Sequence, residues 1–425
     1  MAKYVIVGNS AGAIGAVEAI RQVDKEGSII ILSEESYPVY SRPMISEYLA
    51  GEVDLDQMLY RPRDFYAKNR VETVLSRKAV SLDLTNKLVK LEDGSEINWE
   101  KLLLATGGVP FVPRTPGQEK EGVYTFTTLD DAQRIRERVE YIQRVVVIGG
   151  GLIGMSVTEA LTKLKLKVTV VELKDRVLNL MLDEEGSRRV EAALAQRGVD
   201  IIVNNTVREI VGRDDNPEVV GGVTLNDGRQ IPCDAVIAAI GVVPRTELAA
   251  GTEIKINRGV AVDRHMATNV PDVYACGDVC EGFDFVLQTN RVVPIWPSAY
   301  MGGRVAGFNM AGREAEFFGG TSMNALKYFG LSIISGGVVS PDAPQDYEIL
   351  THVQPENGVY KKVILKDDVV MGLIFFEDID KAGIVYGLMR DKIDVSAFKS
   401  KLLAENFGFI SFPKEMRKQR LGAGQ

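Results

Sequence analysis

The chain opens with a hydrophobic pattern that changes its period twice. The apolar run Tyr4–Val7 has the length of a buried strand, apolar positions at helical spacing then extend through Ile20, and a second apolar run covers Ile29–Leu32. A helix between two such strands allows them to lie side by side in parallel. The pattern therefore predicts a βαβ unit in the first part of the chain.

The same order of elements recurs further along the chain. The apolar run Val145–Ile148 leads into a glycine turn and a helical pattern, and the strand Lys167–Val171 follows. We interpret the repeat as a second βαβ unit. The chain is therefore predicted to be an α/β protein with two Rossmann-like parts.

The residues between strand and helix predict a phosphate-binding turn in the first unit. Gly8 permits a tight turn, Ser10 is small enough for the backbone to approach a pyrophosphate, and Ala13 permits close helix packing. The helix N-terminus favours the phosphate charge. Glu34, at the end of the second strand, can accept the hydroxyls of an adenosine ribose. The alternative is a glycine turn in another kind of α/β sheet, since Ser10 replaces the usual middle glycine.

The second unit fills all three glycine positions, with Gly149, Gly151 and Gly154. Glu172 ends its second strand roughly twenty residues later, at the spacing of the ribose-binding acid in dinucleotide sites. A carboxylate there accepts the 2′-hydroxyl of NAD and repels the 2′-phosphate of NADP, although a basic residue such as the nearby Lys174 weakens that preference. Arg176 has the same effect. The alternative is a second Rossmann repeat without a ligand.

Two further segments, Leu102–Gly108 and Val273–Val279, each begin with a short apolar strand that leads to a glycine. Two dinucleotide sites in one chain suggest that electrons pass between a flavin and a nicotinamide. Asp278 would then take a hydroxyl of the ribitol chain of FAD. The alternative role of Asp278 is that of a helix N-cap.

Composition narrows the class of protein. Hydrophobic residues make up 45% and charged residues 25% of the 425 positions, which is typical of a globular protein of about three domains. The net charge of −8 disfavours nucleic acid as a partner. No stretch reaches the length of a membrane span, and we expect no export signal, because no basic or long apolar segment precedes Tyr4.

The numbers of cysteines and histidines bear on the cellular compartment and on whether the chain holds a metal site. Three cysteines in so long a chain, Cys233, Cys276 and Cys280, indicate a reducing compartment, so we expect the protein to be cytoplasmic. The two histidines, His265 and His352, lie far apart in the sequence, and no metal site is predicted.

Five motifs, in order, resemble the FAD-dependent pyridine nucleotide-disulfide oxidoreductase superfamily. They are Gly8–Ala13, Ala105–Gly108, Gly149–Gly154, Ala239–Pro244 and Tyr274–Asp278. Four further segments are similar to the branch that holds the NADH:rubredoxin reductases and the flavin modules of nitrite reductases. These are Pro38–Ser46, Ile295–Pro297, Gly302–Arg304 and Asn324–Leu331.

The resemblance implies a glutathione-reductase-like α/β architecture. Two Rossmann-like dinucleotide-binding domains would be followed by a C-terminal α+β interface domain. The FAD-binding domain would be discontinuous, at 1–112 and 243–320, with an NAD-binding domain at 113–242 and the interface domain at 321–425.

The resemblance also implies which residues hold the cofactors FAD and NAD(H). The FAD set comprises Gly8, Ser10, Ala11, Gly12, Ala13, Glu34, Arg42, Pro43, Ala79, Thr106, Gly107, Gly277, Asp278, Trp296 and Pro297. The NAD set comprises Gly149, Gly151, Leu152, Ile153, Gly154, Glu172 and Gly241. No side chain is assigned as catalytic, because the flavin carries the chemistry.

Missing cysteines separate the chain from the disulfide reductases. The first helix has no CxxxxC pair, and Arg42–Pro43 stand where coenzyme A disulfide reductases and NADH oxidases carry a reactive cysteine. Thiol–disulfide exchange needs a thiolate. Cys276 and Cys280 would lie about one turn apart if helical and could form a redox pair, but we interpret them as packed residues. Cys233 is interpreted as a core residue.

A second departure separates the chain from the ferredoxin reductases of dioxygenases. Many of these pair a lysine with a glutamate at positions that Glu47 and Ser156 hold here.

The resemblance therefore implies an NADH:acceptor oxidoreductase. A hydride would pass from nicotinamide C4 to flavin N5, and the electrons would go to an external iron-sulfur carrier, or come from it. The carrier would be a rubredoxin, a ferredoxin or an iron-sulfur subunit of a larger complex. The alternatives are an NADH oxidase that reduces dioxygen and a flavin-bearing assembly or signalling subunit with little turnover. The chain could form a homodimer or belong to a larger complex.

The end of the chain is basic and contains an apolar segment. From Arg390 to Gln425 it carries eight basic and four acidic side chains, which favours an acidic carrier or docking into a larger complex. The alternative is a solvated tail. The apolar segment Phe407–Pro413 beside it is expected to be covered by a partner or by a second copy.

Overall fold

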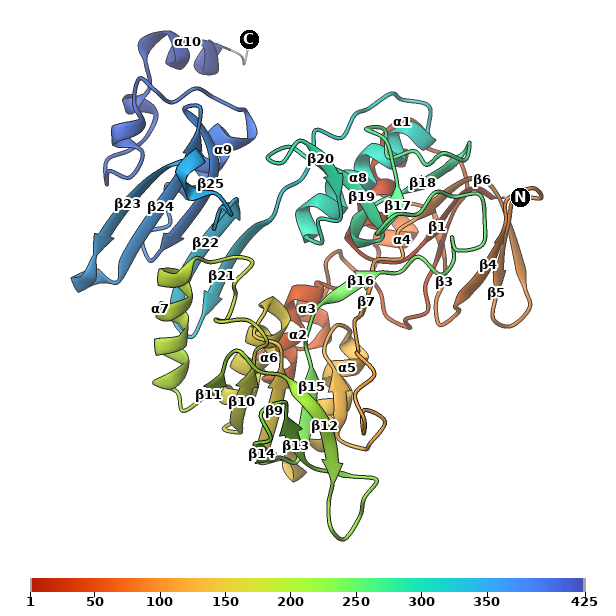
Figure 1. Ribbon diagram of the computed structural model, residues 1–425. Helices are drawn as coiled ribbons and strands as arrows, with labels where there is room; N and C mark the ends of the chain where they lie inside the picture. The colour runs from red at the N-terminus through yellow and green to blue at the C-terminus, as the bar shows by residue number, and fades with distance from the viewer. Residues whose placement is uncertain (1, 423–425) are drawn as a thin grey trace. The chain divides into compact units, whose positions relative to one another are not determined.

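The computed structural model describes residues 2–422, which form two compact units (Figure 1). The first unit is made of the residues up to Phe111, of Thr127–Glu137 and of Gly241–Thr321. The second is made of Val112–Phe126, Arg138–Ile240 and the chain from Ser322 onward. Both units are of mixed α/β type, as the sequence predicts.

A parallel sheet forms the centre of the first unit. Its strand order is β3-β2-β1-β6, and β18 pairs with the other edge of β6. Val7 lies beside Leu32 on one side and Leu104 on the other, so the carboxyl ends of these strands meet at one edge. The strands are β1 (Ala2–Val7), β2 (Ile29–Leu32), β3 (Val71–Val74), β6 (Glu96–Leu104) and β18 (Val273–Ala275).

The first half of β6 also forms an antiparallel meander with two more strands. These are β5 (Leu88–Leu91) and β4 (Ala79–Asp83). The shorter elements of the unit are η1 (Arg42–Met44), α2 (Ile45–Leu49), α3 (Leu55–Met58), α4 (Phe65–Lys68), β7 (Gly108–Pro110), α5 (Leu129–Arg138), β16 (Val242–Pro244), β17 (Val260–Ala261), η3 (Gly277–Val279), β19 (Cys280–Asp284) and β20 (Thr289–Arg291).

Helices α1 (Ala11–Val23) and α8 (Trp296–Met310) of the first unit pack against each other at unusually short range. A Cβ atom added at Gly303 would stand 1.9 Å from the carbonyl oxygen of Gly12, and one at Gly307 would stand 2.4 Å from that of Ala16. The two backbones therefore approach more closely than a side chain at Gly303 or Gly307 would permit. Small residues at these positions are a requirement of the contact itself.

The second unit contains a fully parallel five-stranded sheet, in the order β11-β10-β9-β15-β8. Helix α6 (Leu152–Lys163) connects β9 to β10, and α7 (Glu184–Ala195) connects β10 to β11. The strands are β8 (Val123–Thr125), β9 (Arg144–Ile148), β10 (Lys167–Val171), β11 (Asp200–Ile202) and β15 (Ala235–Ala238). A three-stranded antiparallel sheet of β12 (Val207–Gly212), β13 (Val220–Leu225) and β14 (Gln230–Pro232) packs against it.

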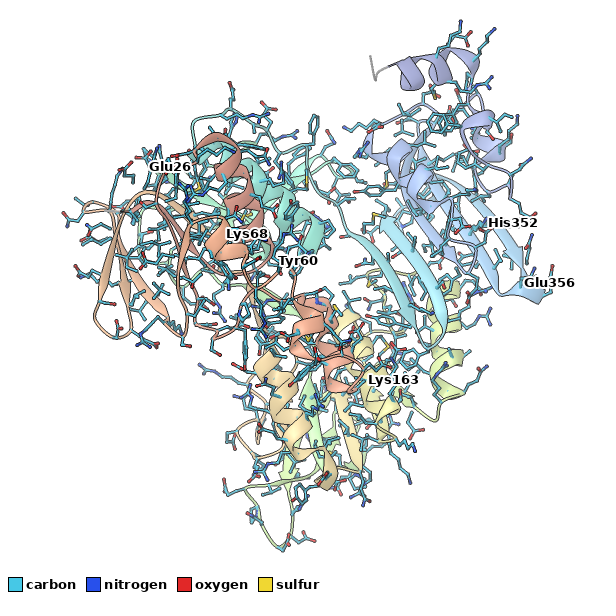
Figure 2. All side chains as sticks on the ribbon, turned by 180° about the vertical axis from the view of Figure 1, so that it is seen from behind. Glu26, Tyr60, Lys68, Lys163, His352 and Glu356 are labelled. Atoms are coloured by element: carbon cyan, nitrogen blue, oxygen red, sulfur yellow. The ribbon has the colours of Figure 1, made fainter. Side chains whose placement is uncertain are left out.

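The rest of the second unit is a C-terminal module built on an antiparallel sheet, drawn in blue in Figure 1. Its strand order is β21-β22-β25-β24-β23, so His352 lies on an edge strand (Figure 2). The strands are β21 (Met323–Tyr328), β22 (Leu331–Gly337), β23 (Glu348–Gln354), β24 (Val359–Lys366) and β25 (Val369–Phe376). Helix α9 (Ala382–Arg390) packs against β25. This α+β module is the predicted third part of the fold.

The apolar segment near the end of the chain is partly buried and partly exposed, so coverage by a partner or a second copy stays an expectation for its exposed residues. Phe407 and Phe412 are buried against Phe398, with ring centroids 6.5 and 5.1 Å from that of Phe398. Phe409 and Ile410 remain 46% and 78% exposed. The chain itself therefore covers Phe407 and Phe412, whereas Phe409 and Ile410 are left partly uncovered by it.

Helix α10 (Lys414–Gly422) follows this segment and carries several of the basic residues noted in the sequence. The side chains from Gln419 onward, and residues 423–425 altogether, lie outside the described residues. No helix among residues 2–422 is both long and apolar enough to span a membrane. The same residues contain no group of His, Cys, Asp and Glu side chains arranged to hold a metal ion.

Candidate dinucleotide-binding sites

The turn after β1 can present backbone amides to a phosphate. Gly8 has φ +117°, and a Cβ atom there would stand 2.1 Å from the carbonyl oxygen of Ala105. Ser10 is the N-cap of α1 and makes no side-chain hydrogen bond to the helix. The first N–H groups of a helix have no partner within the helix, so they attract an anion. The predicted residues Ala11, Gly12 and Ala13 form this first turn.

Two consecutive carboxylates follow β2, and they have different partners. Glu34 forms an ion pair with Arg245. The backbone of Arg245 is tied to the turn after β6, because its N–H donates to the Gly107 carbonyl oxygen (2.9 Å) and its carbonyl oxygen accepts from Thr106 Oγ1 (2.9 Å). Arg245 thus connects three predicted FAD residues. The sequence analysis missed Arg245, because no local pattern links it to Glu34.

Glu35 holds a different arginine. It forms an ion pair with Arg42, and its Oε2 accepts a 2.6 Å hydrogen bond from the Tyr40 hydroxyl. Arg42 also donates to the carbonyl oxygen of Thr127 (3.2 Å). Burial raises the pKa of Tyr40, so this hydroxyl remains a donor near neutral pH. The guanidinium of Arg42 is therefore fixed from two sides by residues that the sequence analysis did not select.

Asp278 lies in the short helix η3, whose N-cap is Cys276, so the alternative role of Asp278 as an N-cap is wrong. Burial raises its pKa to about 6, and the charge of Arg42 opposes this increase. No hydrogen-bond donor reaches its carboxylate from the part of the chain that the structure describes. A half-buried carboxylate without a donor fits a ligand that brings hydroxyl groups, as the ribitol of FAD does.

The remaining predicted FAD residues lie in three places. Trp296 begins α8 with Pro297 in its first turn, and the Tyr60 ring, labelled in Figure 2, meets the Trp296 ring edge-on at 5.0 Å. Pro43 lies in η1 directly after Arg42. Ala79 begins β4, close along the chain to Arg77, whose N–H donates to the Ser33 carbonyl oxygen (3.0 Å). Gly277 precedes Asp278 and has φ +77°.

We expect the affinity of the apoprotein for FAD to depend on the ionisation of Asp278. Hydroxyl donors favour the ionised carboxylate, so FAD should bind more tightly as the pH rises through about 6. The dissociation constant should fall about tenfold between pH 5 and pH 7. In Asp278→Asn this dependence should disappear. Flavin fluorescence titrations of both proteins measure it, with Asp93→Asn in an exposed turn as the control. An equal pH dependence in wild type and Asp278→Asn would contradict the assignment.

The turn after β9 is built like the first one. Gly149 has φ +105°, and a Cβ atom at Gly154 would stand 1.9 Å from the Gly149 carbonyl oxygen. Gly151 is the N-cap of α6 and has open space at its Cβ position. Leu152 and Ile153 are the first residues of the helix, and the backbone here again offers unpaired N–H groups.

Glu172 is held against this turn. Its Oε2 accepts from the Gly150 N–H (2.5 Å), and its Oε1 accepts from the Lys174 N–H (2.8 Å). The structure thus brings the predicted ribose-binding acid and the glycine turn together. The remaining residue of the predicted NAD set, Gly241, belongs to the first unit and has φ +115°.

All three cysteines are free and buried, so the interpretation of Cys233, Cys276 and Cys280 as packed residues is confirmed. Burial raises the pKa of Cys233 and of Cys276 to about 12, and it raises that of Cys280 well above its usual value. Cys276 and Cys280 flank the single turn η3 in extended conformation instead of sharing an α-helix. None of the three offers a thiolate near neutral pH.

Comparison with known proteins agrees with this geometry. Residues 2–303 match the family model of pyridine nucleotide-disulphide oxidoreductases. The chain belongs to this family. Residues 323–393 match the model of the rubredoxin NAD+ reductase C-terminal domain. As a member, the chain is an NAD(H)-dependent flavin oxidoreductase with FAD and NAD(H) as cofactors.

Several relatives cover most of the chain. It is 30% identical over 399 residues to a nitrite reductase of Bacillus subtilis, covering 93% of this chain but only 48% of that one, so it spans about half of that relative. It is 29% identical to the epsilon subunit of the NADH-dependent phenylglyoxylate dehydrogenase of Aromatoleum evansii, covering 95% of this chain and 94% of that one. It is 30% identical to the NADH-rubredoxin oxidoreductase of Clostridium acetobutylicum, covering 80% and 83%.

Among solved structures, the chain is similar to an NAD-dependent persulfide reductase from A. fulgidus. The TM-score is 0.86 at 28% identity, covering 93% of this chain and 78% of that one. The fold that the sequence predicts, two dinucleotide-binding parts followed by an α+β part, is thereby confirmed.

Proposed function

We propose that this chain passes electrons between NAD(H) and an external iron-sulfur protein. The burial of all three cysteines carries the proposal, because a flavoprotein of this family without an available thiolate has no internal disulfide to reduce. The match of residues 323–393 to the C-terminal domain of rubredoxin reductases supports a carrier of this kind. The acceptor is a rubredoxin, a ferredoxin or an iron-sulfur subunit of a larger complex.

The residues of the first unit have distinct tasks in this proposal. The first turn of α1 binds the FAD pyrophosphate with its backbone amides. Glu34 accepts hydrogen bonds from the hydroxyl groups of the adenosine ribose, and Asp278 accepts one from a ribitol hydroxyl. Arg42, fixed by Glu35 and Thr127, keeps a positive charge beside Asp278. A flavin held by these residues would supply the conversion between two-electron hydride transfer and single-electron transfer, which suits a one-electron acceptor.

Two relatives support different acceptors. The similarity to an NADH-rubredoxin oxidoreductase supports a small soluble carrier. The similarity to subunit epsilon of a phenylglyoxylate dehydrogenase, along nearly the full length of both chains, supports a place in a multi-subunit complex. The exposed basic residues Lys414 and Lys418 of α10 favour an acidic partner in either case.

Anaerobic stopped-flow absorbance tests the proposal. The holoenzyme is mixed with NADH and then with rubredoxin, ferredoxin, coenzyme A disulfide or dioxygen. We expect bleaching of the flavin by NADH and the fastest recovery with an iron-sulfur protein. Fastest recovery with dioxygen would instead identify an NADH oxidase. Fastest recovery with the disulfide, abolished in Cys280→Ser, would show that the cysteine argument is wrong. Absence of bleaching would favour a subunit with little turnover.

The choice between NADH and NADPH depends on Glu172 in this proposal. Glu172→Ala removes the acceptor for the 2′-hydroxyl and the charge that repels a 2′-phosphate. The ratio of kcat/KM for NADH to that for NADPH should therefore fall at least about tenfold, as loss of a hydrogen bond to a charged group predicts. Steady-state rates with a fixed acceptor measure it. Glu184→Ala, at an exposed position in the first turn of α7, is the control and should leave the ratio unchanged.

A further inference from the structure

The hairpin between β21 and β22 has a strained tip. Tyr328 pairs with Leu331, which leaves Phe329 and Gly330 as a two-residue turn. Both turn residues have positive φ, +53° for Phe329 and +86° for Gly330, as a type I′ turn requires. Glycine and asparagine adopt this conformation readily, whereas phenylalanine rarely does. Such a conformation persists only where the surrounding contacts hold it.

The surroundings of the tip belong to the dinucleotide-binding part of the same unit. The Phe329 N–H donates to Glu159 Oε1 on α6 (3.1 Å), and the Arg197 guanidinium lies over the Phe329 ring, 5.5 Å from its centroid. The Phe329 side chain is only 3% exposed. The C-terminal module is therefore anchored on α6 at one defined place.

Tyr328 reaches the start of α6 from this anchor. Its hydroxyl lies 2.6 Å from Ser156 Oγ and donates to the Leu152 carbonyl oxygen at 3.3 Å. Leu152 is the first residue of α6 and directly follows the glycine turn, and Ser156 lies one turn further along the helix. One buried phenol thus bridges the first two turns of the helix that begins at the glycine turn.

We propose that Tyr328 is a positioning residue of the NAD(H) site, supplied by the C-terminal module. The inference rests on the proposed function, because it takes the turn Gly149–Gly154 as the NAD(H) site. Backbone N–H groups bind a pyrophosphate only while they point in the right direction, and a mobile first turn loses that alignment. The Tyr328 hydroxyl fixes this turn through Leu152 and Ser156. The C-terminal module therefore takes part in NAD(H) binding as well as in the fold.

The chain offers a matched control. Tyr360, on β24 of the same module, also donates from its hydroxyl to a helix of the dinucleotide-binding part, to Asp183 Oδ2 at 2.6 Å. Asp183 is the N-cap of α7, so this contact fastens the module without touching α6. If tyrosines at this junction have only a structural role, Tyr328→Phe and Tyr360→Phe should behave alike.

The test is isothermal titration of oxidised holoenzyme with NAD+, which binds without turnover. Tyr328→Phe and Ser156→Ala should each weaken NAD+ binding about three- to tenfold, the range for loss of one buried hydrogen bond. The double variant should be no weaker than Tyr328→Phe alone, because removing the Tyr328 hydroxyl already removes its contact with Ser156. Ser156→Thr keeps a hydroxyl and should bind within about twofold of wild type, and Tyr360→Phe should do the same.

Two results would overturn the inference: unchanged NAD+ affinity in Tyr328→Phe, or equal weakening in Tyr360→Phe. The same titration of Glu172→Ala separates this failure from that of the proposed function. If Glu172→Ala weakens NAD+ binding and Tyr328→Phe does not, only the role of Tyr328 is wrong. If neither variant changes NAD+ binding, NAD(H) does not bind at this turn, and the proposed function fails with it.

Discussion

A Gly8→Ala variant is expected to lose FAD. The added Cβ would stand 2.1 Å from the Ala105 carbonyl oxygen, and the residue would keep φ +117°, a conformation that alanine rarely adopts. The clash involves backbone on both sides, so no side-chain rotation can relieve it. The backbone strain and the overpacking together should cost about 2–5 kcal/mol in the free energy of unfolding of the first unit. We expect the turn proposed to bind pyrophosphate to lose its shape at that cost.

The purified Gly8→Ala protein should therefore contain less than about a tenth of the wild-type flavin, as measured by the absorbance ratio of flavin to protein. Gly94→Ala is the matched control. Gly94 also has a positive φ, +84°, but nothing lies within 4 Å of its Cβ position. That variant should be destabilised by about 1 kcal/mol and keep its flavin. Full flavin content in Gly8→Ala would show that the turn after β1 does not bind FAD.

Glycine turns such as the one at Gly8 could be predicted from the sequence because their requirements are local. A strand, a glycine with positive φ and a helix N-terminus follow one another within a few residues, and each imposes a residue type. The same reasoning predicted the turn at Gly149 and the carboxylate at the end of β10. The two turns thus predicted the two dinucleotide-binding parts, and the resemblance that the motifs carry implied the C-terminal α+β part.

The partners of these residues could not be predicted, because they come from distant parts of the chain. The sequence shows two acidic residues after β2 and gives no reason to separate them. In the structure Glu34 pairs with Arg245 and Glu35 pairs with Arg42, so each carboxylate selects a different arginine. Only the three-dimensional fold decides which arginine reaches which oxygen.

The contact between Tyr328 and α6 could not be predicted either, because its two residues are also far apart in the sequence. In the sequence, Ser156 stood out only as an expected departure from the ferredoxin reductases of dioxygenases. Its partner comes from a strand 172 positions later, in a module whose packing on α6 no pattern of hydrophobic residues specifies. The sequence therefore shows the departure at Ser156, and the structure adds the hydroxyl of Tyr328 that Ser156 contacts.

A pair of variants in the second glycine turn is expected to separate folding from NAD(H) binding. At Gly154 a Cβ atom would stand 1.9 Å from the Gly149 carbonyl oxygen, so α6 could not begin where it does. Gly154→Ala should destabilise the second unit by about 2–4 kcal/mol and lower its melting temperature by several degrees. At Gly151 nothing lies within 4 Å, and its φ of −80° suits alanine. Gly151→Ala should therefore leave the melting temperature unchanged.

Gly151→Ala should nevertheless weaken NAD+ binding at least about tenfold, because its methyl group fills the space in which backbone and pyrophosphate must approach each other. Calorimetric titration with NAD+ and differential scanning calorimetry of both variants measure the two effects separately. An intact melting temperature combined with wild-type NAD+ affinity in Gly151→Ala would mean that the dinucleotide does not lie against this turn. An intact melting temperature in Gly154→Ala would mean that α6 can shift to accept a methyl group, and that the close approach to Gly149 is not required for the fold.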